Sequence, residues 1–168
     1  DLHTEIDMVT TPDGSLVAMV HSNNGTTDLN AWVNLFKEFA DSIGADVDMN
    51  QMYGTLYNKA LEGDADCGGI LSYGNYAGEP ITNVEKGRPM VVRTPETKFN
   101  LANFMRSHLY TALGVIKVGM DILTKDEGVE IDTVLGHGGL FKTKGVGQKI
   151  LADAINTPVV VMETAGEG

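Results

Sequence analysis

The region from about residue 131 to residue 162 carries the pattern that most limits the fold. Residues 131–135 and 158–162 have the short, β-branched composition typical of strands, and residues 146–155 have the periodicity of an amphipathic helix. The connection between the two strand patterns is longer than a dozen residues, so the strands can lie parallel. This strand–helix–strand unit predicts an α/β domain and argues against a helix bundle or a β-sandwich.

The segment "GHGGLFKTKG", residues 136–145, joins the first of these strands to the helix. It begins like the dinucleotide fingerprint G-x-G-x-x-G, but Phe141 stands where the third glycine belongs. It is not a P-loop either, since the spacing from Gly139 to Gly145 is one residue too long and no lysine follows. The turn therefore either contacts a ligand by another geometry or simply connects two elements, and taken alone its residues favour the connector.

Three features nevertheless make this turn the best candidate for a binding site. Glycine lets the backbone approach a ligand closely, and the following helix directs its N–H groups and positive dipole end toward the turn. Lys142 and Lys144 can add positive charge near a phosphate, and His137 lies within the turn. A second glycine loop, "NNGTTDLNAW" at residues 23–32, also precedes a helix; alone it favours a helix-capping loop.

Upstream, the sequence predicts a mixture of strands and helices. Two short strands within residues 5–20 flank the turn sequence "TPDG". Asp28 is expected to be the N-cap of a helix that ends near Ile43, and Trp32 is expected in the core. Further helices are predicted at about 50–61 and 100–123, and further strands at 67–73 and 90–93. We expect the strands at 67–73, 131–135 and 158–162 to share one sheet, with the 100–123 helix packed on it.

Composition narrows the classes of function. The net charge of −11, from 23 acidic and 12 basic residues, argues against a nucleic-acid partner. The lone cysteine, Cys67, indicates a reducing and therefore cytoplasmic setting, and no window is apolar enough for a membrane span. The four histidines lack zinc-site spacing, so no metal ligands are expected, and His108 and Cys67 are expected to be structural. Because both ends resemble interior sequence, we expect a piece of a longer chain.

The three strongest patterns, taken in order, resemble the FGGY family of carbohydrate kinases. The segment from Gly136 onward is similar to the family's adenosine-binding segment, with Gln148, Ala152, Asp153, Pro158, Val159 and Glu163 as matching residues. The helix "NLANFMRSHLYTALGVIKVGMDIL" and the segment "NNGTTDLNAWVNLF" resemble a helix and a nucleotide-facing loop of the same family. His137 interrupts the usual glycine run, and the spacing to Gln148 is longer than usual.

The resemblance implies a ribonuclease-H-like, actin-like ATPase domain: α/β, with a mixed sheet and flanking helices. Residues 1–168 would form part of the C-terminal nucleotide-binding domain of a two-domain sugar kinase, without its N-terminal domain. ATP and Mg²⁺ are the implied cofactors, and the catalytic Asp and first phosphate loop would lie upstream, so no catalytic residue is expected here. The implied nucleotide-binding residues are Gly25, Asn30, Gly136, His137, Gly138, Gly139, Lys142 and Thr143.

The implied substrate is a ketopentose such as xylulose. Ribulose, glycerol, gluconate or a deoxyketose remain alternatives, as does a non-catalytic actin-like nucleotide-binding module. The implied partners are ATP, a small sugar and the N-terminal domain, with no nucleic acid and no membrane, and a homodimer is left open.

Overall fold

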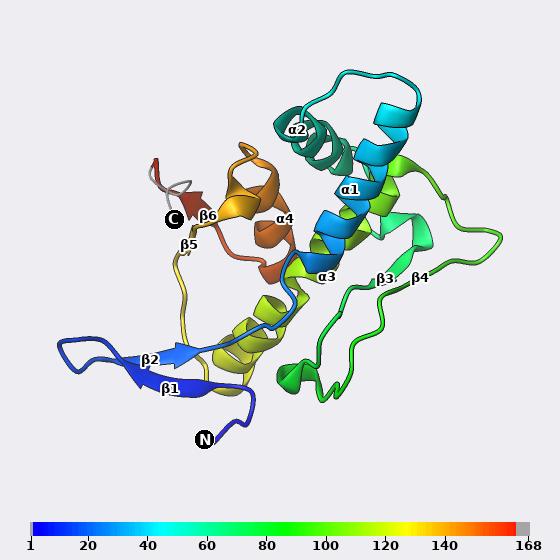
Figure 1. The fold of residues 1–168 in the computed structure, drawn as a ribbon. Coiled ribbons are helices and arrows are strands. Elements are labelled where there is room, and N and C mark those ends of the chain that lie inside the picture. Colours follow the sequence, from blue (N-terminus) through cyan, green and yellow to red (C-terminus); the bar gives the residue numbers. More distant parts are fainter. Residues whose placement is uncertain (1, 164–168) are drawn as a thin grey trace.

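The computed structural model describes residues 2–163 of the chain (Figure 1). The helices are α1 (Thr27–Ser42), α2 (Met49–Ala60), α3 (Leu101–Asp121) and α4 (Val146–Ile155), with short helical turns η1 (Cys67–Gly69), η2 (Pro80–Thr82), η3 (Ile122–Asp126) and η4 (Gly139–Phe141). The strands are β1 (Asp7–Thr10), β2 (Leu16–Met19), β3 (Leu71–Tyr73), β4 (Met90–Val92), β5 (Val134–Gly136) and β6 (Val159–Val161).

Helix α3 forms the centre of the domain. It contacts α1, α2, α4 and β3, and every residue from 102 to 109 is buried (Figure 1). The first half of α3 is thus buried on all sides, whereas its second half is partly exposed, with Ile116 39% exposed. No helix among the described residues is long and apolar enough to cross a membrane. The core is built from apolar side chains of the four long helices: Leu29, Val33, Leu56, Ala60, Met105, Leu109, Ile150 and Leu151.

The predicted N-terminal hairpin is confirmed. Strands β1 and β2 pair antiparallel, with Asp7 opposite Met19 and Thr10 opposite Leu16. Gly14 closes the turn at φ +87°, a conformation that favours glycine. The hairpin projects from the body of the domain in Figure 1, and its exit packs against α3. A Cβ at Gly119 would lie 2.2 Å from Val20 Cγ2, so α3 requires glycine at this contact.

The predicted strand–helix–strand unit is also confirmed. Strands β5 and β6 pair parallel, with Val134 opposite Val159 and Gly136 opposite Val161. Helix α4 connects them and packs against both β6 and α3. The glycine turn at 137–145 is thereby held at the C-terminal end of β5, where ligands of α/β domains commonly bind.

The expectation of one shared sheet is wrong. The described strands form three separate two-stranded sheets, β1–β2, β3–β4 and β5–β6, and β3 pairs only with β4. Residues 67–69 form the turn η1 because Cys67, Gly68 and Gly69 all have positive φ, so β3 begins only at Leu71, which is 70% exposed. Helix α3 contacts both β3 and α4 and lies between β3–β4 and β5–β6 (Figure 1).

Two expectations about single residues have different outcomes. The expected N-cap Asp28 is wrong, since Thr26 occupies that position and its carbonyl accepts from the Asn30 N–H at 2.9 Å. Asp28 lies instead inside the first turn of α1 and is buried, with a carboxylate oxygen 3.1 Å from His108 Nδ1. The expectation for Trp32 is confirmed in part, since the residue is partly buried and its ring packs edge-on against core residue Phe104 at a centroid distance of 4.8 Å.

Candidate functional site

A cleft of about 790 Å³ lies where the start of α1, one face of α2, the middle of α3 and the turn after β5 meet. Its size falls within the range of small-molecule sites. The lining residues come from four separate segments of the chain: Gly25, Thr26, Asn30, Asn50, Tyr53, Tyr57, Ala112, Leu113, Ile116, His137, Gly139, Leu140, Phe141, Lys142 and Thr143.

The two glycine loops singled out in the sequence contribute to this same cleft. Residues 25–30 supply one part of its lining and residues 137–143 another, although they are far apart along the chain. Of the residues expected at a nucleotide site, Gly25, Asn30, His137, Gly139, Lys142 and Thr143 line the cleft, and Gly136 and Gly138 do not.

Gly136 and Gly138 shape the turn. A Cβ at Gly136 would lie 2.7 Å from the Phe141 ring, and one at Gly147 would lie 2.9 Å from it, so the ring fills the space of two absent side chains. Gly138 has φ +101° and ψ −178°, a region open essentially to glycine alone. Phe141, which breaks the dinucleotide fingerprint, therefore packs the turn against the start of α4.

Gln148 also has a structural role. Its Oε1 accepts a hydrogen bond of 2.8 Å from the Gly145 N–H at the start of α4. Gly145 is the residue before the first helical turn, so this contact is the half of a capping box in which the third helical residue reaches back to the N-cap N–H; glycine has no side chain to supply the other half.

Sequence reasoning missed the wall of the cleft formed by α2 and α3. Tyr53 and Tyr57 lie one turn apart on α2 with their rings edge to face at 5.5 Å, and Leu113 and Ile116 add aliphatic surface from α3. Burial, together with the neighbouring Tyr53, raises the pKa of Tyr57, so its hydroxyl stays protonated at neutral pH. The available signal was the i, i+4 spacing of the two tyrosines, which does not distinguish a cleft wall from a core stripe.

The electrostatics of the cleft differ from those of the whole chain. The chain carries 23 acidic residues, yet none of the residues that line the cleft in the described region is Asp or Glu. Lys142 and His137 are the basic side chains of the lining, and Asn30, Asn50, Thr26 and Thr143 supply neutral polar groups. An aromatic and aliphatic wall beside a non-acidic polar rim suits a ligand with a flat apolar part and an anionic part.

The described residues offer no protein cage for a metal ion. No group of three or more His, Cys, Asp or Glu side chains that could hold one is found between residues 2 and 163. Mg²⁺ binds well to phosphate oxygens and water with few protein ligands. These residues therefore fit a metal that enters with a phosphate-bearing ligand, and they do not fit a resident ion.

A second hollow, of about 730 Å³, lies between α3 and α4. Two charged residues, Arg106 and Asp153, line it. Arg106 donates to Tyr110 Oη at 2.9 Å and lies 3.3 Å from an Asp153 carboxylate oxygen. The charges in this hollow thus already pair with each other. The cleft lined by α1, α2, α3 and the turn after β5, called here the α1–α2–α3 cleft, is the candidate site because both glycine loops line it.

The described residues form an α/β domain, as expected, and the ribonuclease-H-like, actin-like class is that of the family whose model matches the chain. The chain belongs to the FGGY family of carbohydrate kinases, whose C-terminal domain model matches residues 1–168. Members of this family are phosphotransferases that act on carbohydrates. No curated protein sequence matches the chain significantly.

Solved structures that share this fold include two xylulose kinases. One is xylulose kinase from Bifidobacterium adolescentis, with a TM-score of 0.70 and 18% identity over 98% of this chain. The other is ligand-bound xylulose kinase from Lactobacillus acidophilus, with a TM-score of 0.70 and 15% identity over 96% of this chain. The chain spans 29% and 30% of the length of these two proteins.

Proposed function

We propose that this chain is the nucleotide-binding part of an ATP-dependent sugar kinase and that ATP binds in the α1–α2–α3 cleft. The observation that carries the proposal is the meeting of two glycine loops, at 25–30 and 137–143, on one cleft that bears no carboxylate. Both loops precede helices, so both present backbone N–H groups where an anionic ligand needs them.

Different regions of the cleft suit different parts of ATP. The purine is the flat apolar part, and it fits the wall of Tyr53, Leu113 and Ile116. The ribose and phosphates fit the polar rim, where Lys142 and the backbone of Gly25 and Gly139 lie. In this arrangement the chain's own residues bind and orient the nucleotide and exclude water from one side of it.

Phosphoryl transfer depends chiefly on positioning and on neutralising charge. We assign this chain the positioning of the nucleotide. The base that deprotonates the sugar and the grip on the terminal phosphates belong, in this proposal, to an N-terminal domain of the full-length kinase. Mg²⁺, bound to the phosphates, would supply the charge neutralisation.

The proposed substrate is a ketopentose, with xylulose first, because two proteins that share the fold are named xylulose kinases. Ribulose, glycerol, gluconate and a deoxyketose are the alternatives within the family. We place the enzyme in the cytoplasm, where ATP and reduced thiols such as Cys67 coexist. A homodimer is left open.

The test uses the full-length kinase that contains this chain. The enzyme is incubated with Mg-ATP and each member of a panel of ketoses and polyols, and ADP release is measured. We expect sugar-dependent ADP release with xylulose. Lys142→Ala should raise the KM for ATP about tenfold, since it removes a charged contact. Lys149→Ala, an exposed lysine on α4 outside the cleft, is the matched control and should leave that KM unchanged.

The non-catalytic module gives a different result in the same experiment. Calorimetry would detect ATP binding to such a module, but none of the sugars in the panel would cause it to release ADP. Absence of both binding and turnover would contradict both functions.

A further inference from the structure

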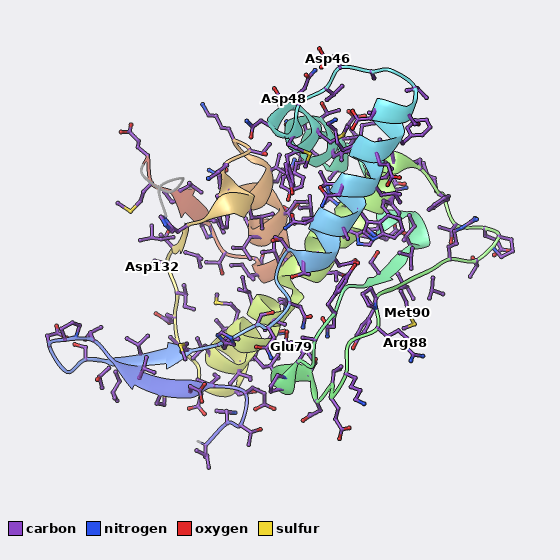
Figure 2. The ribbon with its side chains drawn as sticks, viewed as in Figure 1. Asp46, Asp48, Glu79, Arg88, Met90 and Asp132 are labelled. Carbon is purple, nitrogen blue, oxygen red and sulfur yellow. The ribbon has the colours of Figure 1, made fainter. Side chains whose placement is uncertain are left out.

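Glu79 is an acidic residue that is fully buried in an irregular segment of the chain. Its exposed fraction is 0%, and it precedes η2 in the long loop between β3 and β4. Its backbone is fixed by two hydrogen bonds to Val84, from Glu79 N to Val84 O at 2.7 Å and back at 3.1 Å. In Figure 2 Glu79 lies between the segment that follows β2 and the η2 turn.

The Glu79 carboxylate receives its hydrogen bonds from one short segment. Oε2 accepts from Ser22 Oγ at 3.0 Å, from the Asn23 N–H at 3.1 Å and from Asn24 Nδ2 at 2.9 Å. No ion pair to this carboxylate is found among residues 2–163. A buried carboxylate is tolerated only when hydrogen bonds replace its hydration, so the Glu79 carboxylate holds these three neutral donors in place.

Asn24 extends the contact in the other direction. Its Oδ1 accepts from the Tyr76 N–H at 2.7 Å and the Ala77 N–H at 2.9 Å, so both ends of its amide are bound to the same loop. The backbone carbonyl of Asn24 accepts a hydrogen bond of 3.0 Å from the N–H of Thr27, the first residue of α1. The residues between these two points are Gly25 and Thr26, and both line the cleft.

We propose that Glu79 is a positioning residue for the nucleotide site: through Ser22, Asn23 and Asn24 it fixes the loop that presents Gly25 and Thr26 to ATP. This inference rests on the proposed function. Glu79 itself does not line the cleft, so it acts on the nucleotide only through the loop. Its loss should weaken ATP binding while the sugar site, which we place largely on the N-terminal domain, is unaffected.

The test compares three variants of the full-length kinase. Glu79→Gln keeps the size of the side chain but turns one acceptor oxygen into a donor amide facing other donors. Ser22→Ala removes a single donor and is the milder variant in case Glu79→Gln does not fold. Glu62→Gln is the matched control, because Glu62 is exposed and pairs only with Lys59 on the surface among the described residues.

The expected result is a rise of about tenfold in the KM for ATP with Glu79→Gln, a smaller rise with Ser22→Ala and no change with Glu62→Gln. The KM for the sugar should stay within about twofold of the wild-type value. Amide hydrogen exchange of residues 22–27 in the nucleotide-free protein should accelerate in the first two variants only.

Two outcomes would overturn the proposal. One is a lowered Tm with an unchanged KM for ATP in folded Glu79→Gln, or in Ser22→Ala if the first variant does not fold. The other is an equal rise in the KM for ATP and for the sugar, which indicates a general loss of structure. If the wild-type kinase neither binds nor consumes ATP, the proposed function fails, and the exchange of residues 22–27 still reports on whether Glu79 fixes the loop.

Discussion

The hydroxyl of Tyr53 lies 3.0 Å from Oδ1 of Asn30, and this hydrogen bond ties α2 to the first turn of α1 inside the cleft. The Asn30 side-chain oxygen is thus already hydrogen-bonded, and between residues 2 and 163 no partner is found for its NH₂ group, which can donate to a ligand. One side-chain hydrogen bond therefore joins the two helices that form this wall of the cleft.

We predict that Tyr53→Phe raises the KM for ATP in the full-length kinase about fivefold, because a typical hydrogen bond contributes about 1 kcal/mol. Tyr57→Phe is the control, since it removes a hydroxyl from the same helix for which the described residues give no hydrogen-bond partner. Steady-state kinetics at saturating sugar measure both. An equal effect of the two substitutions would contradict a specific role for the Tyr53–Asn30 contact.

The second prediction concerns Gly138. Gly138→Ala should raise the KM for ATP, because a non-glycine residue at φ +101° strains the turn and displaces the residues at 139–143 that line the cleft. Gly14→Ala is the control, since Gly14 has φ +87° and also has open space around it, but it lies in the β1–β2 turn. Both should lose about 1–3 kcal/mol of stability. Only Gly138→Ala should change the KM, and a parallel change in both would sink this prediction.

Buried His108 should make stability depend on pH. Burial lowers the pKa of His108 below its usual value of 6.5, and the Asp28 carboxylate 3.1 Å away only partly opposes this shift. The unfolded chain therefore takes up a proton first as the pH falls below about 6.5, and the folded form loses stability there. The loss should approach, at most, about 1.4 kcal/mol per pH unit for this one group.

Chemical denaturation of the full-length kinase at pH 7.5, 6.5 and 5.5 measures this slope. His108→Gln should flatten it, whereas His21→Gln, at an exposed position, should leave it unchanged. A slope that is the same in His108→Gln as in the wild type would contradict the lowered pKa of His108.

The fourth prediction tests the core. Leu109 is fully buried on α3, so Leu109→Lys should lower the free energy of unfolding by about 3–5 kcal/mol through an unpaired buried charge. Leu35 on α1 is 50% exposed, and Leu35→Lys should change the free energy of unfolding by no more than about 0.5 kcal/mol. Denaturant titration of both gives the comparison. Similar losses in the two variants would mean that α3 is not the centre of the fold.

The fifth prediction concerns the 168-residue chain by itself. It should bind ATP or ADP weakly and phosphorylate no sugar, because a transition state held from two sides of a cleft cannot be assembled from one. ADP release from Mg-ATP and a ketose panel tests this. Turnover at roughly 1–100 per second would place the base within the chain. Of the two acidic residues nearest the glycine loops, Asp28 is buried beside His108, which leaves the exposed Asp132 (Figure 2) as the first candidate.

The sequence by itself determined the local elements and the two glycine loops. The turn "TPDG" specifies its hairpin, and the periodicity of residues 100–123 specifies α3. The length of the connection between β5 and β6 permits their parallel pairing. These features depend on residues close together in the chain, where steric preferences and hydrophobic spacing act directly.

Only the tertiary structure decided what those elements face. The apolar stripe of α2 has the same spacing whether Tyr53 meets a core or a cleft, and Glu79 in "GEP" has the composition of a solvated loop until Ser22, Asn23 and Asn24 are brought to it. The separation of β3–β4 from β5–β6 depends likewise on where α3 packs. The physical reason is that burial and hydrogen bonding of these groups come from segments distant in sequence, and no local pattern records such contacts.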